Sequence, residues 1–160
     1  MSEELLEVLE KNARATLTDL AAMLGKSESK VQEEIKALQD SGTIKQFKTV
    51  VDWEKVGRER VYSIIEVKLS PERGRGYDAV AERIMLFPEV RTGYLLSGSY
   101  DLIVIVEGKS LKDVSNFVAE KLAPIEGVTS TNTHFLLKKY KEDGQVFFEK
   151  EDADRLAVTA

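Results

Sequence analysis

The sequence predicts an α+β protein of two small domains: an N-terminal winged helix-turn-helix domain and a C-terminal ferredoxin-like β-α-β-β-α-β domain. Three observations predict this class. Short capped helices fill the first fifty residues, a strand-helix-strand pattern occurs twice in the remainder, and 160 residues suffice for two modest cores.

The composition of the chain excludes several classes of function. Hydrophobic residues (42%) and charged residues (32%) have globular proportions, and the net charge of -5 argues against indiscriminate binding to nucleic acid. Cysteine is absent and one histidine is present, so we expect no metal, no cofactor, no catalytic residues and hence no enzyme. No apolar run could span a membrane and the N-terminus is acidic, so we expect a cytoplasmic protein.

Three helices are predicted in the first domain. The first has an apolar stripe from Leu5 to Leu9 and stops near Asn12, and Thr16 begins the second with a capping pattern. Gly25 ends the second helix and Ser27 can cap the third. The third helix should bury Val31, Ile35 and Leu38.

The spacing of Ala21, Gly25 and Val31 is typical of a helix-turn-helix, because a small residue, a glycine turn and a β-branched residue let two helices cross closely. An ordinary helical hairpin is the alternative. Gly42 ends the third helix, and the β-branched run to Val51 is predicted to form a wing or a linking strand. The first domain is therefore placed at residues 1–51 and the linker at 52–60.

The strand-helix-strand repeat lies in residues 61–148. In its first copy a strand over 61–69 precedes a helix whose inward residues are Tyr77, Val80, Ala81 and Ile84. In its second copy the apolar strand at 101–108 precedes a helix whose inward residues are Leu111, Val114, Phe117, Val118 and Leu122. Pro88 and Pro124 follow the two helices, and each precedes another strand. Residues 149–160 are predicted to be a polar tail.

Two such units place both helices on one face of a four-stranded sheet. The other face is left open, and a sheet face of this size commonly pairs with a second copy, so we expect a homodimer.

The outward face of the third helix is the candidate DNA-reading surface. It carries Ser29, Lys30, Gln32, Glu33 and Lys36. Gln32 could contact adenine and Glu33 could accept from a cytosine amino group, whereas Glu34 should repel the DNA backbone. Cations that could meet phosphates lie outside this helix: Arg14, Lys26, Lys45 and Lys48. The alternative is a solvated acidic face that no longer reads DNA.

The turn between the two inner strands is the candidate effector site. Ser97, Gly98, Ser99, Tyr100 and Asp101 offer hydroxyls, a flexible backbone and a carboxylate suited to an amino acid. These are also the residues that turns ordinarily contain, and the pattern alone favours that plain interpretation. His134, in an apolar strand, is expected to pack in the core or at an interface rather than to catalyse.

With a helix-turn-helix, the linking segment "TIKQFKTVVDWEKVG" and a β-α-β-β-α-β domain carrying "SGSYDL", the chain resembles the Lrp/AsnC, or feast/famine, family of transcription regulators over nearly its whole length. The family usually has Gly-Asp-Tyr-Asp where this chain has Gly98 to Asp101. In the recognition helix, this chain keeps the two serines of the family pattern as Ser27 and Ser29. It has Glu28 where the family has proline, and Glu33 and Glu34 where arginines are common in the family.

The resemblance implies a DNA-binding domain tied to a sensing domain whose dimers assemble into tetramers or octamers. It also implies an amino-acid effector bound between dimers near Gly98 to Asp101. The function expected is thus a ligand-responsive transcription regulator that binds double-stranded DNA, a small effector and itself. The alternative is an oligomeric small-molecule sensor or interaction protein whose acidic helix-turn-helix no longer binds DNA.

Overall fold

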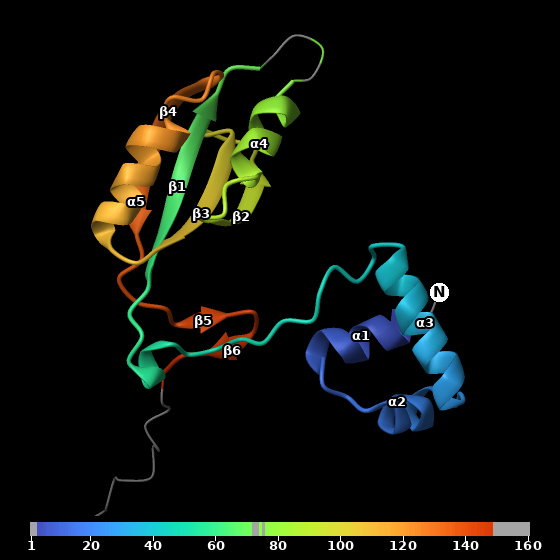
Figure 1. Ribbon diagram of the computed structural model, residues 1–160. Coiled ribbons are helices and arrows are strands. Elements are labelled where there is room, and N and C mark those ends of the chain that lie inside the picture. The colour runs from blue at the N-terminus through green and yellow to red at the C-terminus, as the bar shows by residue number, and fades with distance from the viewer. Residues whose placement is uncertain (1–2, 72–73, 75, 149–160) are drawn as a thin grey trace, which may run out of the picture. The chain divides into compact units, whose positions relative to one another are not determined.

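The computed structural model describes residues 3–71, 74 and 76–148, and the chain divides after Val50 into two compact units (Figure 1). The tail predicted at 149–160 lies outside the described residues. The α+β architecture predicted from the sequence is confirmed: helices alone form the first unit, and a four-stranded sheet with two helices forms the second.

The first unit contains α1 (Glu3–Lys11), α2 (Leu17–Leu24) and α3 (Glu28–Asp40). Thr16 caps α2, since its side chain accepts the backbone N–H of Asp19, and Ser27 caps α3 in the same way. Gly25 takes φ 61° between the two helices, a left-handed conformation that favours glycine. The core of this unit is Leu5, Leu9, Leu20, Val31 and Leu38.

Residues 45–52 form neither a helix nor a paired strand. Of the two alternatives for the run after Gly42, the structure therefore shows a linking segment rather than a paired wing. A short 3₁₀ turn, η1 (Glu54–Val56), opens the second unit, and Gly57 ends it at φ 68°.

The sheet of the second unit has the order β2-β3-β1-β4, with every neighbouring pair antiparallel. Its strands are β1 (Val61–Leu69), β2 (Val90–Leu95), β3 (Leu102–Gly108) and β4 (Val128–Phe135). Helices α4 (Asp78–Met85) and α5 (Leu111–Phe117) lie on one face, and α5 continues as a π-helical turn, η2 (Val118–Leu122) (Figure 1). The repeated strand-helix-strand pattern is confirmed.

The core lies between the sheet and these helices. Alternate residues of β1 and β3 are buried, as expected for strands with one covered face. They pack against Val80 and Ile84 of α4, and against Phe117 of α5 and Leu122 of η2. The inward prediction for Leu111 was wrong: its side chain is 57% exposed, because it is the first residue after the Ser110 cap.

A small hairpin that the sequence did not predict follows β4. Strands β5 (Lys141–Glu142) and β6 (Gln145–Val146) pair across a turn in which Asp143 and Gly144 both have positive φ. Its ladder extends to Tyr140, whose carbonyl accepts the N–H of Phe147.

Candidate functional site

The outward face of α3 is built by the helix-turn-helix core. Val31 and Leu38 are buried and Ile35 packs against them, so the opposite side of the helix must face solvent. The five residues predicted for DNA reading are all exposed: Ser29, Lys30, Gln32, Glu33 and Lys36. The structure therefore brings the predicted residues together on one accessible surface.

Glu34 is not part of that surface. Lys26, from the turn before α3, donates from Nζ to both carboxylate oxygens of Glu34 at 2.8 Å, and both side chains are about three-quarters buried. The sequence placed Glu34 against the DNA backbone and Lys26 among the phosphate-binding cations, and the structure corrects both expectations. The pair spans eight residues across a turn, a separation that no helical spacing indicates.

A second acidic residue of α3 is also engaged. Glu28, in the first turn, accepts a hydrogen bond from the hydroxyl of Thr18 at 2.7 Å and lies where the helix dipole favours an anion. Of the four acidic residues of α3, Glu34 thus has an ion pair and Glu28 a hydrogen bond within the unit, whereas Glu33, on the outward face, and Asp40, at the end of the helix, are exposed.

The predicted phosphate-binding residues flank α3. The Ser27 hydroxyl oxygen accepts the N–H of Lys30 at 3.4 Å as the helix cap, which leaves its proton free to donate. Lys45 and Lys48 are exposed on the segment after α3. Both ends of the helix therefore present hydrogen-bond donors for the phosphate oxygens of a DNA backbone.

The candidate effector turn joins β2 to β3 in the second unit. The expectation that it joins two inner strands was wrong, because β2 lies at the edge of the sheet. Ser97, Gly98 and Ser99 are exposed, whereas Tyr100 and Asp101 are half-buried. Gly98 has φ 154°, and a Cβ added there would meet nothing within 4 Å. The backbone conformation at this point, not crowding, therefore favours glycine.

Asp101 fastens this turn to β1. Its Oδ2 accepts the backbone N–H of Leu69 at 2.8 Å and lies 3.7 Å from Nζ of Lys68. Lys68 also donates to the carbonyl of Ser99 at 2.8 Å. Asp101 thus has a structural role beside any role in binding, and the freely accessible polar groups of the turn belong to Ser97 and Ser99.

Apolar side chains lead into the turn. Tyr94, Leu95 and Leu96, at the end of the edge strand β2, are 59%, 56% and 41% exposed. A run of exposed apolar residues of this kind commonly marks a contact with another chain.

The sheet face opposite the helices carries the single histidine. His134 Nε2 lies 3.0 Å from Oε2 of Glu66 on the neighbouring strand, and Asn132 donates to the same oxygen at 3.0 Å. The hydrogen bonds from His134 and Asn132 hold the pKa of Glu66 below its ordinary range. The core alternative for His134 was wrong, since its side chain is 55% exposed on this open face.

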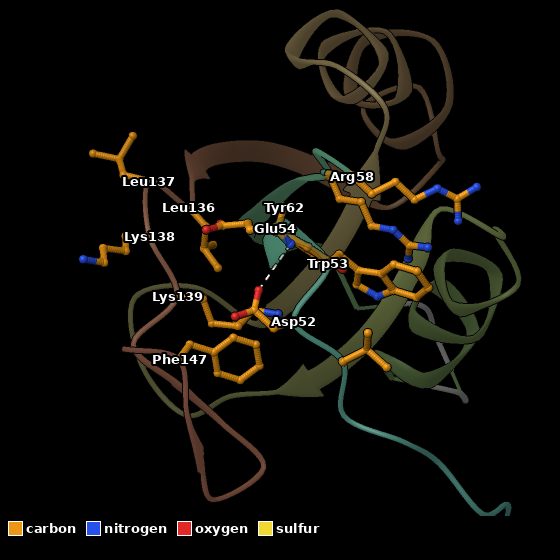
Figure 2. A pocket seen from close by; sticks show the side chains of 12 residues that line it. Asp52, Trp53, Glu54, Arg58, Tyr62, Leu136, Leu137, Lys138, Lys139 and Phe147 are labelled. Carbon is orange, nitrogen blue, oxygen red and sulfur yellow. Dashed lines mark hydrogen bonds between the residues drawn. The ribbon is translucent and has the colours of Figure 1, made fainter. Parts of the chain in front are cut away.

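A small cavity of about 60 Å³ lies where the second unit begins (Figure 2). Its aromatic lining comes from Trp53, Tyr62 and Phe147, and Arg60 stacks on the Trp53 ring at 4.2 Å. Its charges are largely compensated, because Arg60 pairs with Glu107 and Lys139 pairs with Glu142. Figure 2 shows Leu137 and Lys138 pointing away from the other lining residues.

A larger hollow of about 390 Å³ lies beside β3 and α5, and neither cavity includes residues of the candidate effector turn. The sequence indicated neither hollow. Within the described residues, no cluster of histidine and acidic side chains could hold a metal ion, and no helix is long and apolar enough to cross a membrane.

The two units together define a DNA-binding protein with an attached ligand-binding domain. The sequence profile of a winged helix-turn-helix DNA-binding domain matches residues 2–45, and that of the Lrp/AsnC ligand binding domain matches residues 63–146. The chain belongs to the Lrp/AsnC family of transcription regulators.

Relatives cover both units. The chain is 46% identical to the uncharacterized HTH-type transcriptional regulator YugG of Bacillus subtilis, over 98% of this chain and 95% of the relative. It is 32% identical to the regulator FL11 of Pyrococcus furiosus, over 89% and 91% of the two chains. A regulator from Neisseria meningitidis, solved as a complex with L-methionine, shares the fold with a TM-score of 0.66 at 23% identity, over 89% of this chain and 93% of that one.

Proposed function

We propose that this transcription regulator reads DNA with the outward face of α3 and changes its binding when an amino acid or related small metabolite occupies the turn at 97–101. The observation that carries the proposal is the composition of the α3 face. With Glu34 neutralised by Lys26, this face presents Lys30, Gln32 and Lys36 around the unpaired carboxylate of Glu33. Ser27, Lys45 and Lys48 would hold the phosphates. Acting on DNA in this way, the protein would work in the cytoplasm.

The effector is proposed from two supports. The turn exposes the hydroxyls of Ser97 and Ser99 beside an accessible backbone, which suits the carboxylate and ammonium groups of an amino acid. The Neisseria regulator with this fold was solved with L-methionine, so an amino acid is the first class of ligand to test.

Self-association completes the proposed mechanism. The open sheet face would form a homodimer, and the apolar residues beside the turn, Tyr94 to Leu96, would bring dimers together around the effector as tetramers or octamers. An effector can alter DNA binding only if it binds one assembly state more tightly than another. The effector would therefore act by shifting the population of assembly states.

The proposal is tested by fluorescence anisotropy with the DNA upstream of the protein's own gene and with unrelated DNA, at several salt concentrations, with and without each amino acid. We expect preferential binding to the first DNA, a steep salt dependence, and a change with at least one amino acid. No preference between the two DNAs at low salt would favour the alternative, an oligomeric sensor that does not read DNA.

The turn itself is tested with Ser99→Ala, because Asp101→Ala would also remove the acceptor of the Leu69 N–H. The variant should keep its DNA affinity and lose its response to the effector. An unchanged response in Ser99→Ala and in Ser97→Ala would remove the turn from the effector site.

A further inference from the structure

Glu33 has a special position on α3. Because successive helical residues are about 100° apart, Glu33 lies roughly opposite Val31 and Ile35, which face the core, and so points straight outward. It is exposed, and no hydrogen bond or ion pair engages its carboxylate within the part of the chain that the structure describes. The residue at the centre of the proposed DNA-reading face is therefore an unpartnered acid.

An unpartnered carboxylate is the wrong charge for a phosphate backbone, so its contribution must come from a base edge. An ionised carboxylate can only accept hydrogen bonds. In the major groove the donors are the N4 amino group of cytosine and the N6 amino group of adenine. Guanine presents N7 and O6, both acceptors, and thymine presents O4 and a methyl group.

Cytosine and adenine differ in what lies beside the donor. The adenine amino group is next to N7, an acceptor that would repel a second carboxylate oxygen, whereas cytosine presents no acceptor on its major-groove edge. Cytosine can therefore donate a hydrogen bond to a carboxylate at this position without repelling its second oxygen, whereas adenine donates one but repels the second oxygen. Opposite guanine or thymine, the carboxylate loses water and gains no donor.

We infer that Glu33 is a specificity-determining residue that requires cytosine at one position of the bound sequence; this inference rests on the proposed DNA-reading role of α3. Glu33 acts mainly by penalising other bases, because it adds an acceptor and a negative charge to a surface that must approach DNA. Replacing that cytosine in the DNA should weaken binding by roughly fivefold to 150-fold.

The experiment is a selection from a random duplex library with the full-length protein and three variants. Glu33→Gln should change the preferred base at one position from cytosine to adenine, since a glutamine amide pairs with N6 and N7 of adenine. Glu33→Ala should lose the preference at that position alone. Titrations with duplexes that differ only at that position then measure each preference as a ratio of dissociation constants.

Glu34→Gln is the matched control, since it removes the same charge from the neighbouring residue, whose side chain is held by Lys26 away from the outward face. It can change general affinity for DNA but should keep the cytosine preference. A selected sequence that is the same for wild type and Glu33→Gln would overturn the inference while leaving the proposed function in place. A wild-type protein that selects no sequence would overturn both.

Discussion

At the scale of single residues, the charge that α3 offers to DNA depends on which carboxylates already have partners. Counting along the sequence gives α3 a net negative charge, but Glu34 is bound by Lys26 and Glu28 by the Thr18 hydroxyl. The lysine that neutralises Glu34 lies outside the helix, so a count within the helix misses it. The ion pair turns an apparently acidic helix into a mixed polar surface.

Lys26→Met tests this pair. It should lower the stability of the first unit by about 1 kcal/mol and weaken DNA binding, because it leaves a largely buried carboxylate without a partner beside the DNA-reading face. Stability is followed by circular dichroism and DNA affinity by anisotropy. The double variant Lys26→Met with Glu34→Gln should recover most of both losses, and no recovery would show that Lys26 acts through another contact.

A residue of the second unit should respond to acid. The hydrogen bond from Lys121 holds the pKa of Glu89 below its ordinary range. A carboxylate with a lowered folded-state pKa stabilises the fold at neutral pH, and that stability is lost as the pH falls from the ordinary glutamate range through the lowered value. Lys121→Met should therefore lower stability at pH 7 and flatten the decline of stability as the pH falls below the ordinary glutamate range.

This measurement uses chemical denaturation at several pH values, followed by the fluorescence of Trp53, the one tryptophan of the chain, which lies in the second unit. Lys112→Met, at an exposed residue of α5, is the control and should reproduce the wild-type profile. Equal acid sensitivity in Lys121→Met and wild type would mean that the Glu89 pair does not contribute.

At the scale of elements, the sequence predicts the features that depend on residues close together along the chain. Helix caps at Thr16 and Ser27, the glycine at 25 and the alternation along β1 all act within a few residues, and all are found in the structure. The exposed side chain of Leu111 was missed because apolar spacing does not show where a helix first reaches the sheet. The β5–β6 hairpin was missed because two-residue strands are too short to show alternation.

For the candidate sites, the sequence suggests residues but does not show which partners their side chains contact. The residues of the α3 face and of the 97–101 turn were identified from local pattern, yet their roles depend on partners distant in sequence. Asp101 contacts Leu69, 32 residues away, and His134 contacts Glu66, 68 residues away. Such pairings follow from strand register, which one sequence alone does not specify at this detail.

Gly25→Ala tests the element that sets the crossing of α2 and α3. It should destabilise the first unit by about 1 kcal/mol, because φ is 61° and the added Cβ meets nothing within 4 Å, so the cost is conformational. Gly25→Asn should cost less, since asparagine tolerates this conformation better. Helical circular dichroism should show the loss, while the Trp53 transition of the second unit stays unchanged; equal stability of the alanine variant and wild type would contradict this account.

At the scale of the whole molecule, the proposed dimer through the open sheet face would let two helix-turn-helix units act together. Ile64 and Ile105 are cross-strand neighbours on this face, and both remain partly exposed in the single chain. A central apolar pair bordered by polar residues such as Glu66 and His134 has the apolar centre and polar rim that are common in protein interfaces. Two linked DNA-binding units gain affinity through avidity, without any new contact to DNA.

Ile105→Glu should therefore separate the proposed oligomer into monomers and weaken DNA binding by roughly a hundredfold to ten-thousandfold, with α3 itself unaltered. The charge lies on the open face rather than in the core, so the sheet should still fold and the Trp53 transition should persist.

Leu111→Glu is the matched control, because Leu111 is exposed on α5, on the other side of the sheet. Sedimentation would give the oligomeric state and anisotropy the affinity of each variant. If Ile105→Glu keeps the wild-type oligomeric state, the open face is not the interface; if it becomes monomeric with full affinity, DNA binding does not depend on paired units.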